Sequence, residues 1–129
     1  MSIIFQEIER CLSGLTHDSD GKITARFSFP PEFIGFKGHF PNQPVLPGVC
    51  ITQAVTAIFK ALKKEEVRLQ EIVLAKFFTP VSANQELFFE CRSTKKENGQ
   101  LLVKVLVVSG DGKKIAELQL KLSGGIAKE

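Results

Sequence analysis

One long apolar segment, from Gly48 to Lys64, limits the folds that this chain can adopt. At helical spacing, almost all of its surface is apolar, and a helix of this kind has to be covered on most sides. It would span roughly 25 Å at 1.5 Å per residue. The polar side chains share a single arc of about 120° at this spacing, and they are Thr52, Gln53, Thr56, Lys60, Lys63 and Lys64.

Four strand-like runs follow the helix, over residues 70–78, 86–93, 101–108 and 114–122. The connections between the last three contain Asn98-Gly99 and Gly110-Asp111-Gly112, which predict tight hairpin turns. Because such turns make consecutive strands antiparallel, the last three strands are predicted to form a meander.

The first 30 residues contain one clear strand and one ambiguous segment. Apolar and polar residues alternate from Ile23 to Phe29, which predicts a strand with one buried face that ends at Pro30. Residues 3–15 fit a helix by spacing, but they also fit a strand that forms a hairpin through residues 17–21. Both interpretations stay open.

Taken together, these elements predict an α+β fold in which an antiparallel sheet curves around the long helix. The length of 129 residues suits a single domain, 1–129.

Composition excludes several classes of protein. No apolar run approaches the ~18 residues of a membrane span, and no signal peptide is visible, so we expect a cytoplasmic protein. The three cysteines lack metal-ligand spacing, which argues against a zinc site or a disulfide framework. A net charge of +3 without tryptophan or tyrosine makes a nucleic-acid partner a poor interpretation.

The segment 38–49, GHFPNQPVLPGV, has the character of an active site. Three of the six prolines lie between residues 41 and 47, and they restrict the backbone that carries His39. An imidazole titrates near neutral pH and can act as a general base. Pro47 and Gly48 suit the first turn of a helix, whose free N–H groups can bind a carbonyl or an anion.

This segment resembles the signature of the 3-hydroxyacyl-acyl carrier protein dehydratases of fatty acid synthesis. The likeness covers roughly residues 33–90. It is supported further along by Lys76-Phe77, Pro80-Val81 and Glu86-Leu87. The resemblance implies a hotdog fold, a homodimer or a higher oligomer of dimers, and an active site at the dimer interface.

In the family, the motif histidine removes the α-proton of a (3R)-3-hydroxyacyl thioester, and this role carries over to His39. An acidic residue fourteen positions later protonates the leaving hydroxyl, and that position is Gln53 in this chain. A glutamine amide can donate a hydrogen bond but cannot deliver a proton at neutral pH. Gly48 and Val49 would polarise the thioester carbonyl through their N–H groups, and Phe40 and Pro47 would contact the substrate.

Three features keep two interpretations each. Cys50 could act as a nucleophile beside His39, although core packing is the simpler explanation. The basic residues at the helix end could dock an acidic carrier protein or only complement the helix dipole, and they are Lys60, Lys63, Lys64 and Arg68. Phenylalanines near the motif could line an acyl tunnel or belong to the core, and these are Phe33, Phe36, Phe40, Phe77 and Phe78.

The sequence therefore predicts reversible dehydration of 3-hydroxyacyl thioesters carried on acyl carrier protein, with no metal and no cofactor other than the carrier's phosphopantetheine. A non-catalytic acyl- or carrier-binding subunit, paired with a catalytic partner, is the alternative that Gln53 favours. A hotdog thioesterase ranks third, because no carboxylate lies near the motif on the helix.

Overall fold

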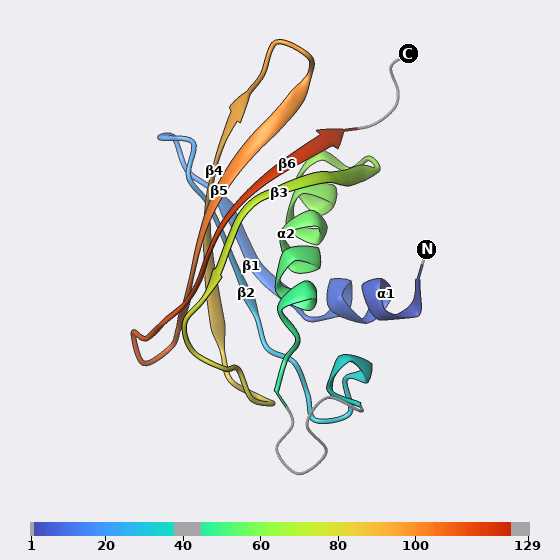
Figure 1. Ribbon diagram of the computed structural model, residues 1–129, viewed down its shortest axis with the longest axis vertical. Helices are drawn as coiled ribbons and strands as arrows, with labels where there is room; N and C mark the ends of the chain where they lie inside the picture. The colour runs from blue at the N-terminus through green and yellow to red at the C-terminus, as the bar shows by residue number, and fades with distance from the viewer. Residues whose placement is uncertain (1, 38–44, 125–129) are drawn as a thin grey trace.

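The long helix forms as predicted and lies against a six-stranded antiparallel sheet. The computed structural model describes residues 2–37 and 45–124. Helix α2 runs from Gly48 to Lys63, within one residue of the prediction, and it ends at Lys64 in the left-handed conformation (φ 58°). Figure 1 shows the sheet curving around this helix. Nine residues of α2 between Cys50 and Phe59 are buried, because the sheet covers most of the helix surface.

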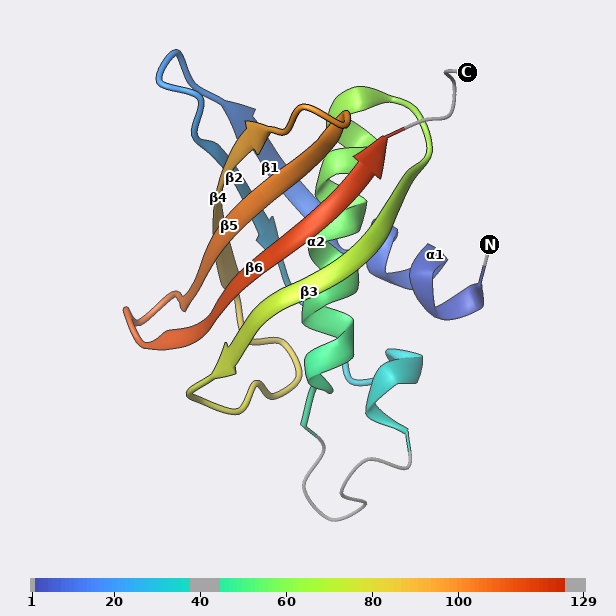
Figure 2. The same ribbon diagram turned by 45° about the horizontal axis from the view of Figure 1, so that its top comes forward.

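The strands are joined in the order β1-β2-β4-β5-β6-β3, and Figure 2 shows this order across the sheet. Their bounds are Leu12–His17 for β1, Ile23–Phe27 for β2, Val67–Phe77 for β3, Leu87–Lys95 for β4, Gln100–Ser109 for β5 and Lys114–Gly124 for β6.

The predicted meander is confirmed, since β4, β5 and β6 are consecutive neighbours. Gly99 (φ 87°) and Gly112 (φ 88°) lie in the two turns, in a conformation that glycine adopts without steric cost. The strand predicted for residues 23–29 is also present, although it ends at Phe27. Its predicted buried face is confirmed, because Ile23, Ala25, Phe27 and Phe29 are all buried.

The ambiguous N-terminal segment contains both of the predicted alternatives. Helix α1 (Ile3–Arg10) comes first, and the Ser2 side chain caps it by accepting a hydrogen bond from the Phe5 N–H. Strand β1 follows and forms the hairpin with β2. The pairing of β1 is irregular between Ser13 and Thr16, where Gly14 has a positive φ of 59°.

One hydrophobic core joins the concave face of the sheet to both α-helices. An aromatic cluster continues it below α2, where Phe29 lies 4.8 Å from Phe33 between ring centroids. Phe33 in turn meets Phe36, the last residue of the short 3-10 helix η1 (Ile34–Phe36), edge to face. This packing fixes the segment from Phe29 to Phe36 against the core.

Candidate functional site

The start of α2 is held by the segment that follows β3. The backbone N–H of Leu46 donates to the carbonyl of Val81 at 2.8 Å, so the chain enters the helix at a fixed place. Pro47 is the N-cap, with an extended backbone (ψ 144°), and Gly48 begins the helix. The N–H groups of a first helical turn have no partner within the helix, which leaves them available to a ligand.

Gly48 lies against the ring of Phe77. A Cβ at residue 48 would be 2.8 Å from the nearest ring carbon, closer than real Cβ contacts. The glycine is therefore required here for packing, in addition to any role of its N–H group. A hollow of about 400 Å³ opens beside this contact, and its lining includes Ile51 and Phe78.

Val49 follows in the first turn, and 59% of its side chain is exposed. Exposure of a large apolar residue at this end of the helix suits contact with a ligand or a second chain. His39 and Phe40, the other two predicted site residues near the helix start, lie outside the described residues.

Gln53 lies in a groove of about 340 Å³ that follows α2 between α1 and β3. The floor is formed by Thr52 and Thr56 of α2, and Leu69 and Ile72 of β3 form one side. The Gln53 side chain is only partly exposed, and its Oε1 is fully buried without a hydrogen-bond partner among the described residues. A buried acceptor without a donor is costly, so this oxygen marks a place where a donor is missing.

The hydroxyl of Thr52 does not supply that donor. Its Oγ1 donates to the carbonyl of Val49 at 2.8 Å, within the same helix. Among the described residues, no other group supplies a donor to the Gln53 oxygen.

Lys60 closes the far end of the groove. Its ammonium lies 3.2 Å from the Glu9 carboxylate and 3.7 Å from that of Glu66, and 5.4 Å from the centre of the Phe5 ring. These contacts join α1, α2 and the turn before β3. Sequence reasoning missed this arrangement, because it depends on α1, whose existence the apolar spacing left open.

The pairing of Lys60 also changes the predicted docking patch. Two carboxylates already neutralise this lysine, so it is a poor site for an acidic carrier. Lys63, Lys64 and Arg68 remain exposed at the same end of the molecule.

The cysteines behave as small apolar residues. All three are free, and Cys50 and Cys91 are fully buried. Burial raises the pKa of Cys50 to about 11. A thiol with this pKa stays protonated at neutral pH, so the nucleophilic role considered for Cys50 is wrong, and core packing is confirmed.

The phenylalanines near the motif divide into two groups. Phe33 and Phe36 are buried in the core. Phe77 and Phe78 are about half exposed, at 48% and 49%. Together with Ile72 and Val73, they form a row of exposed apolar residues along β3 and just after its end. The outer edge of β3 pairs with no other described strand. An exposed apolar edge of this kind is typical of a surface that pairs with another chain.

No cluster of three or more potential metal ligands occurs in residues 2–37 and 45–124. Neither of the two α-helices in this part of the chain has the length and apolar character that crossing a bilayer demands.

Comparison with known proteins places this arrangement in a family. The model of the ApeI-like family, described as ApeI dehydratase, matches residues 15–119. A 3-hydroxyacyl-[acyl-carrier-protein] dehydratase FabZ from Anaeromyxobacter sp. (strain K) is 37% identical over 94 residues, which cover 65% of this chain and 60% of the relative. The FabZ of Clostridium botulinum (strain Okra / Type B1) is 37% identical over 92 residues, or 66% of this chain and 63% of the relative. The chain thus matches less than two thirds of the length of these relatives.

Solved structures show the same fold at low sequence identity. The dehydratase heterocomplex ApeI:P from Xenorhabdus doucetiae matches with a TM-score of 0.74 and 20% identity, over 87% of this chain and 96% of that one. The (R)-hydratase from A. caviae involved in PHA biosynthesis matches with a TM-score of 0.66 and 10% identity, over 79% of this chain and 92% of that one. With a sheet wrapped around a central helix and a family match over most of its length, this chain has the hotdog fold and belongs to the ApeI-like dehydratase family.

Proposed function

We propose that this protein catalyses the reversible dehydration of (3R)-3-hydroxyacyl thioesters carried on acyl carrier protein, in fatty acid or related acyl-chain biosynthesis. The observation that carries the proposal is the buried oxygen of Gln53 in the groove beside α2, which has no hydrogen-bond partner in residues 2–37 and 45–124. A 3-hydroxyl group of the substrate is a donor of the right kind for this oxygen.

In the proposed mechanism, His39 removes the α-proton and the N–H groups of Gly48 and Val49 stabilise the negative charge that develops on the thioester oxygen. Gln53 holds the leaving hydroxyl through its amide. Because the amide has no acidic proton, the proton that leaves with the hydroxyl comes from His39 itself or from a water molecule. General acid catalysis contributes about 10²–10⁴-fold, so we expect slow turnover.

We propose that the substrate enters the groove from the side on which a second protomer lies. The exposed row on β3 would pair with the same strand of a partner, which would lie over the groove and complete the site. The acidic carrier would dock on Lys63, Lys64 and Arg68 by attraction that high salt screens.

A non-catalytic subunit is the second candidate, and Gln53 is the observation that favours it. In this case, the chain keeps the groove and binds the acyl carrier, while a dehydratase partner in a mixed dimer supplies the acid. The likeness to one chain of a dehydratase heterocomplex is compatible with this candidate.

The two candidates are separated by turnover of a 3-hydroxyacyl-acyl carrier protein, followed by mass spectrometry of the carrier. Wild type, Gln53→Glu and His39→Ala are compared, with Lys96→Ala, in the exposed turn between β4 and β5, as a control. If the proposal is correct, wild type forms the enoyl product, Gln53→Glu is faster by about 10²-fold or more, and His39→Ala is inactive.

Activity in Gln53→Glu alone would contradict catalysis by the wild type and favour the non-catalytic subunit. Release of free acid and carrier thiol would favour a thioesterase. Full activity of His39→Ala would exclude His39 as the base.

A further inference from the structure

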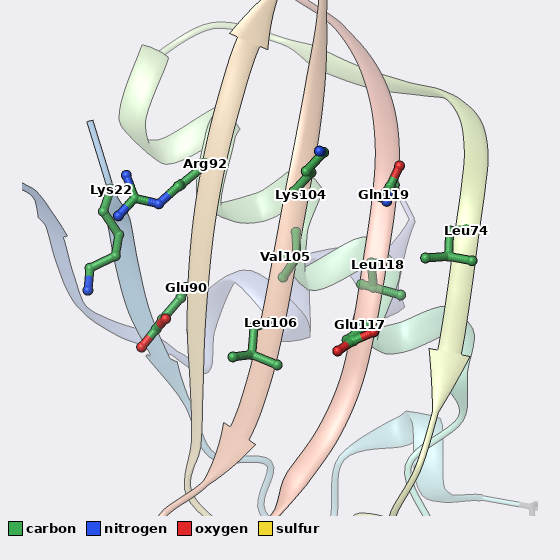
Figure 3. A pocket seen from close by; sticks show the side chains of 10 residues that line it. All are labelled: Lys22, Leu74, Glu90, Arg92, Lys104, Val105, Leu106, Glu117, Leu118 and Gln119. Atoms are coloured by element: carbon green, nitrogen blue, oxygen red, sulfur yellow. The ribbon is translucent and has the colours of Figure 1, made fainter. Parts of the chain in front are cut away.

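The face of the sheet that points away from α2 carries two neighbouring rows of opposite charge (Figure 3). They surround a shallow depression of about 360 Å³. Within each row, the residues of β4, β5 and β6 lie directly opposite one another in the register of the sheet. The acidic row is Glu90, Leu106 and Glu117, which Lys76 of β3 adjoins, and the basic row is Arg92, Lys104 and Gln119.

The fold itself makes little use of these charges. Arg92 and Lys104 lie directly opposite each other on β4 and β5, and like charges in that position destabilise a sheet. Neither residue, nor Glu90, forms an ion pair within 4 Å with any residue in the described part of the chain. Arg92 donates only to the carbonyl of Asp20, at 3.4 Å. Glu117 is paired, with Lys114 at 2.8 Å.

We infer that this face binds the same face of a second copy of the chain. A two-fold axis that crosses the strands between the two rows would place each acidic row over the partner's basic row. Glu90 would then face Arg92 of the other copy, twice in the same contact. This is a self-complementary, isologous interface, the kind that closed dimers use.

Beyond the rows, the same axis brings apolar residues of β4 and β5 together. On β6 it brings Lys114 over the partner's Lys121, and each of these lysines already has a carboxylate partner in its own chain, Glu117 and Glu71. Phe88 and Val108 lie opposite each other beyond the acidic row, and Leu102 lies beyond the basic row. All three are partly exposed. The axis places the residues beyond the acidic row over the residues beyond the partner's basic row, so Val108 would contact the partner's Leu102. The contact uses neither the edge of β3 nor the groove with Gln53, so it is independent of the proposed activity.

The test is sedimentation equilibrium of the full chain at low salt and at high salt. At low salt, the mass of the wild type is expected to double as the concentration rises, in addition to any doubling that pairing through β3 causes. High salt should abolish this association. Across the proposed axis, Glu90→Arg places an arginine opposite the partner's Arg92, and Arg92→Glu places a glutamate opposite the partner's Glu90. Each variant alone should associate at least about tenfold more weakly, because like charges then face each other.

An equimolar mixture of the two variants provides the decisive measurement. Only in the mixed pair do the two variants bring opposite charges together at residues 90 and 92, so the mixture should associate more tightly than either variant alone. The double variant Glu90→Arg/Arg92→Glu should also regain association. Lys96→Glu and Glu97→Arg, in the exposed turn between β4 and β5, are matched controls and should behave as wild type.

Wild type that does not associate at low salt, or a mixture that associates no better than its components, would overturn the inference. Circular dichroism checks that each variant is folded. If Arg92→Glu does not fold, Arg92→Asp replaces it in the mixture.

Discussion

At the scale of single residues, the contact between Gly48 and Phe77 gives a prediction for stability. Gly48→Ala would place a methyl group 2.8 Å from the ring, so the ring or the helix start has to move. We expect a loss of about 1–3 kcal/mol in the free energy of unfolding, measured with urea. Phe77→Ala in the same chain should recover part of it.

Val49→Ala is the control for this experiment, because Val49 is next in sequence and mostly exposed. It should change the unfolding free energy by about 0.5 kcal/mol or less. If Gly48→Ala is as stable as wild type, the Phe77 ring can move away from the helix start without a cost in the free energy of unfolding.

Cys91 predicts how stability depends on pH. Burial, and then the nearby charge of Glu90, raise the pKa of this thiol to about 12, whereas an unfolded cysteine titrates near 8.5. The unfolded chain therefore loses its proton first, and stability falls as the pH rises above about 8.5. The contribution of this thiol is up to about 1.4 kcal/mol per pH unit.

Unfolding by urea at pH 8 and pH 10 measures this effect. Cys91→Ala should be less stable at pH 8, because it leaves a cavity, but the difference from wild type should narrow at pH 10. A constant difference would show that the Cys91 thiol ionises equally in the folded and unfolded chains.

The sequence names candidate residues but does not describe their surroundings. Gln53 follows from the resemblance to the dehydratase family, and its amide chemistry follows from the residue type. The packing of Phe77 on Gly48 and the missing donor at the Gln53 oxygen depend on how β3 lies along α2, which no local pattern encodes.

At the scale of elements, Lys60 connects α1 to the rest of the molecule. Lys60→Met keeps the aliphatic stem but removes both ion pairs, so we expect a loss of roughly 0.5–1 kcal/mol in unfolding free energy, with a smaller loss at high salt. Hydrogen exchange should show faster exchange in α1 than elsewhere. Lys63→Met, one turn further on and exposed, is the control, and equal effects of the two variants would contradict a specific role for Lys60.

The long elements were predictable and the first strand was not. Helix α2 and strands β2, β4, β5 and β6 have clear apolar periodicity and strong turn signals. In β1, the positive φ of Gly14 interrupts the pairing, so apolar residues do not alternate along it. Strand β3 begins at Val67, earlier than predicted. The charged residues around this start hide its apolar pattern in the sequence.

At the scale of the whole molecule, the exposed edge of β3 predicts the state of the protein in solution. Ile72→Lys/Val73→Lys places charge on this edge, and lysine there opposes strand pairing. Light scattering should show that the variant has half the mass of the wild type. Ile34→Lys changes an exposed apolar residue far from the edge and should leave the mass unchanged. If the wild type is a monomer, a site that is completed by the β3 strand of a partner is excluded.

The strand order was not predictable from the sequence. Tight turns fix only neighbours along the chain, and β3 is followed by a long connection instead of a hairpin. Its place beside β6 results from the need to cover α2 on both sides.

That place has a consequence for synthesis on the ribosome. Val67 of β3 pairs with Gly124 of β6, and Phe77 pairs with Ala116, so β3 has no partner strand until residues 114–124 have left the exit tunnel. Until then, its apolar side chains are exposed on a nascent chain, where long-range pairing is slow and aggregation competes. Truncation before β6 should therefore yield a chain that chaperones retain.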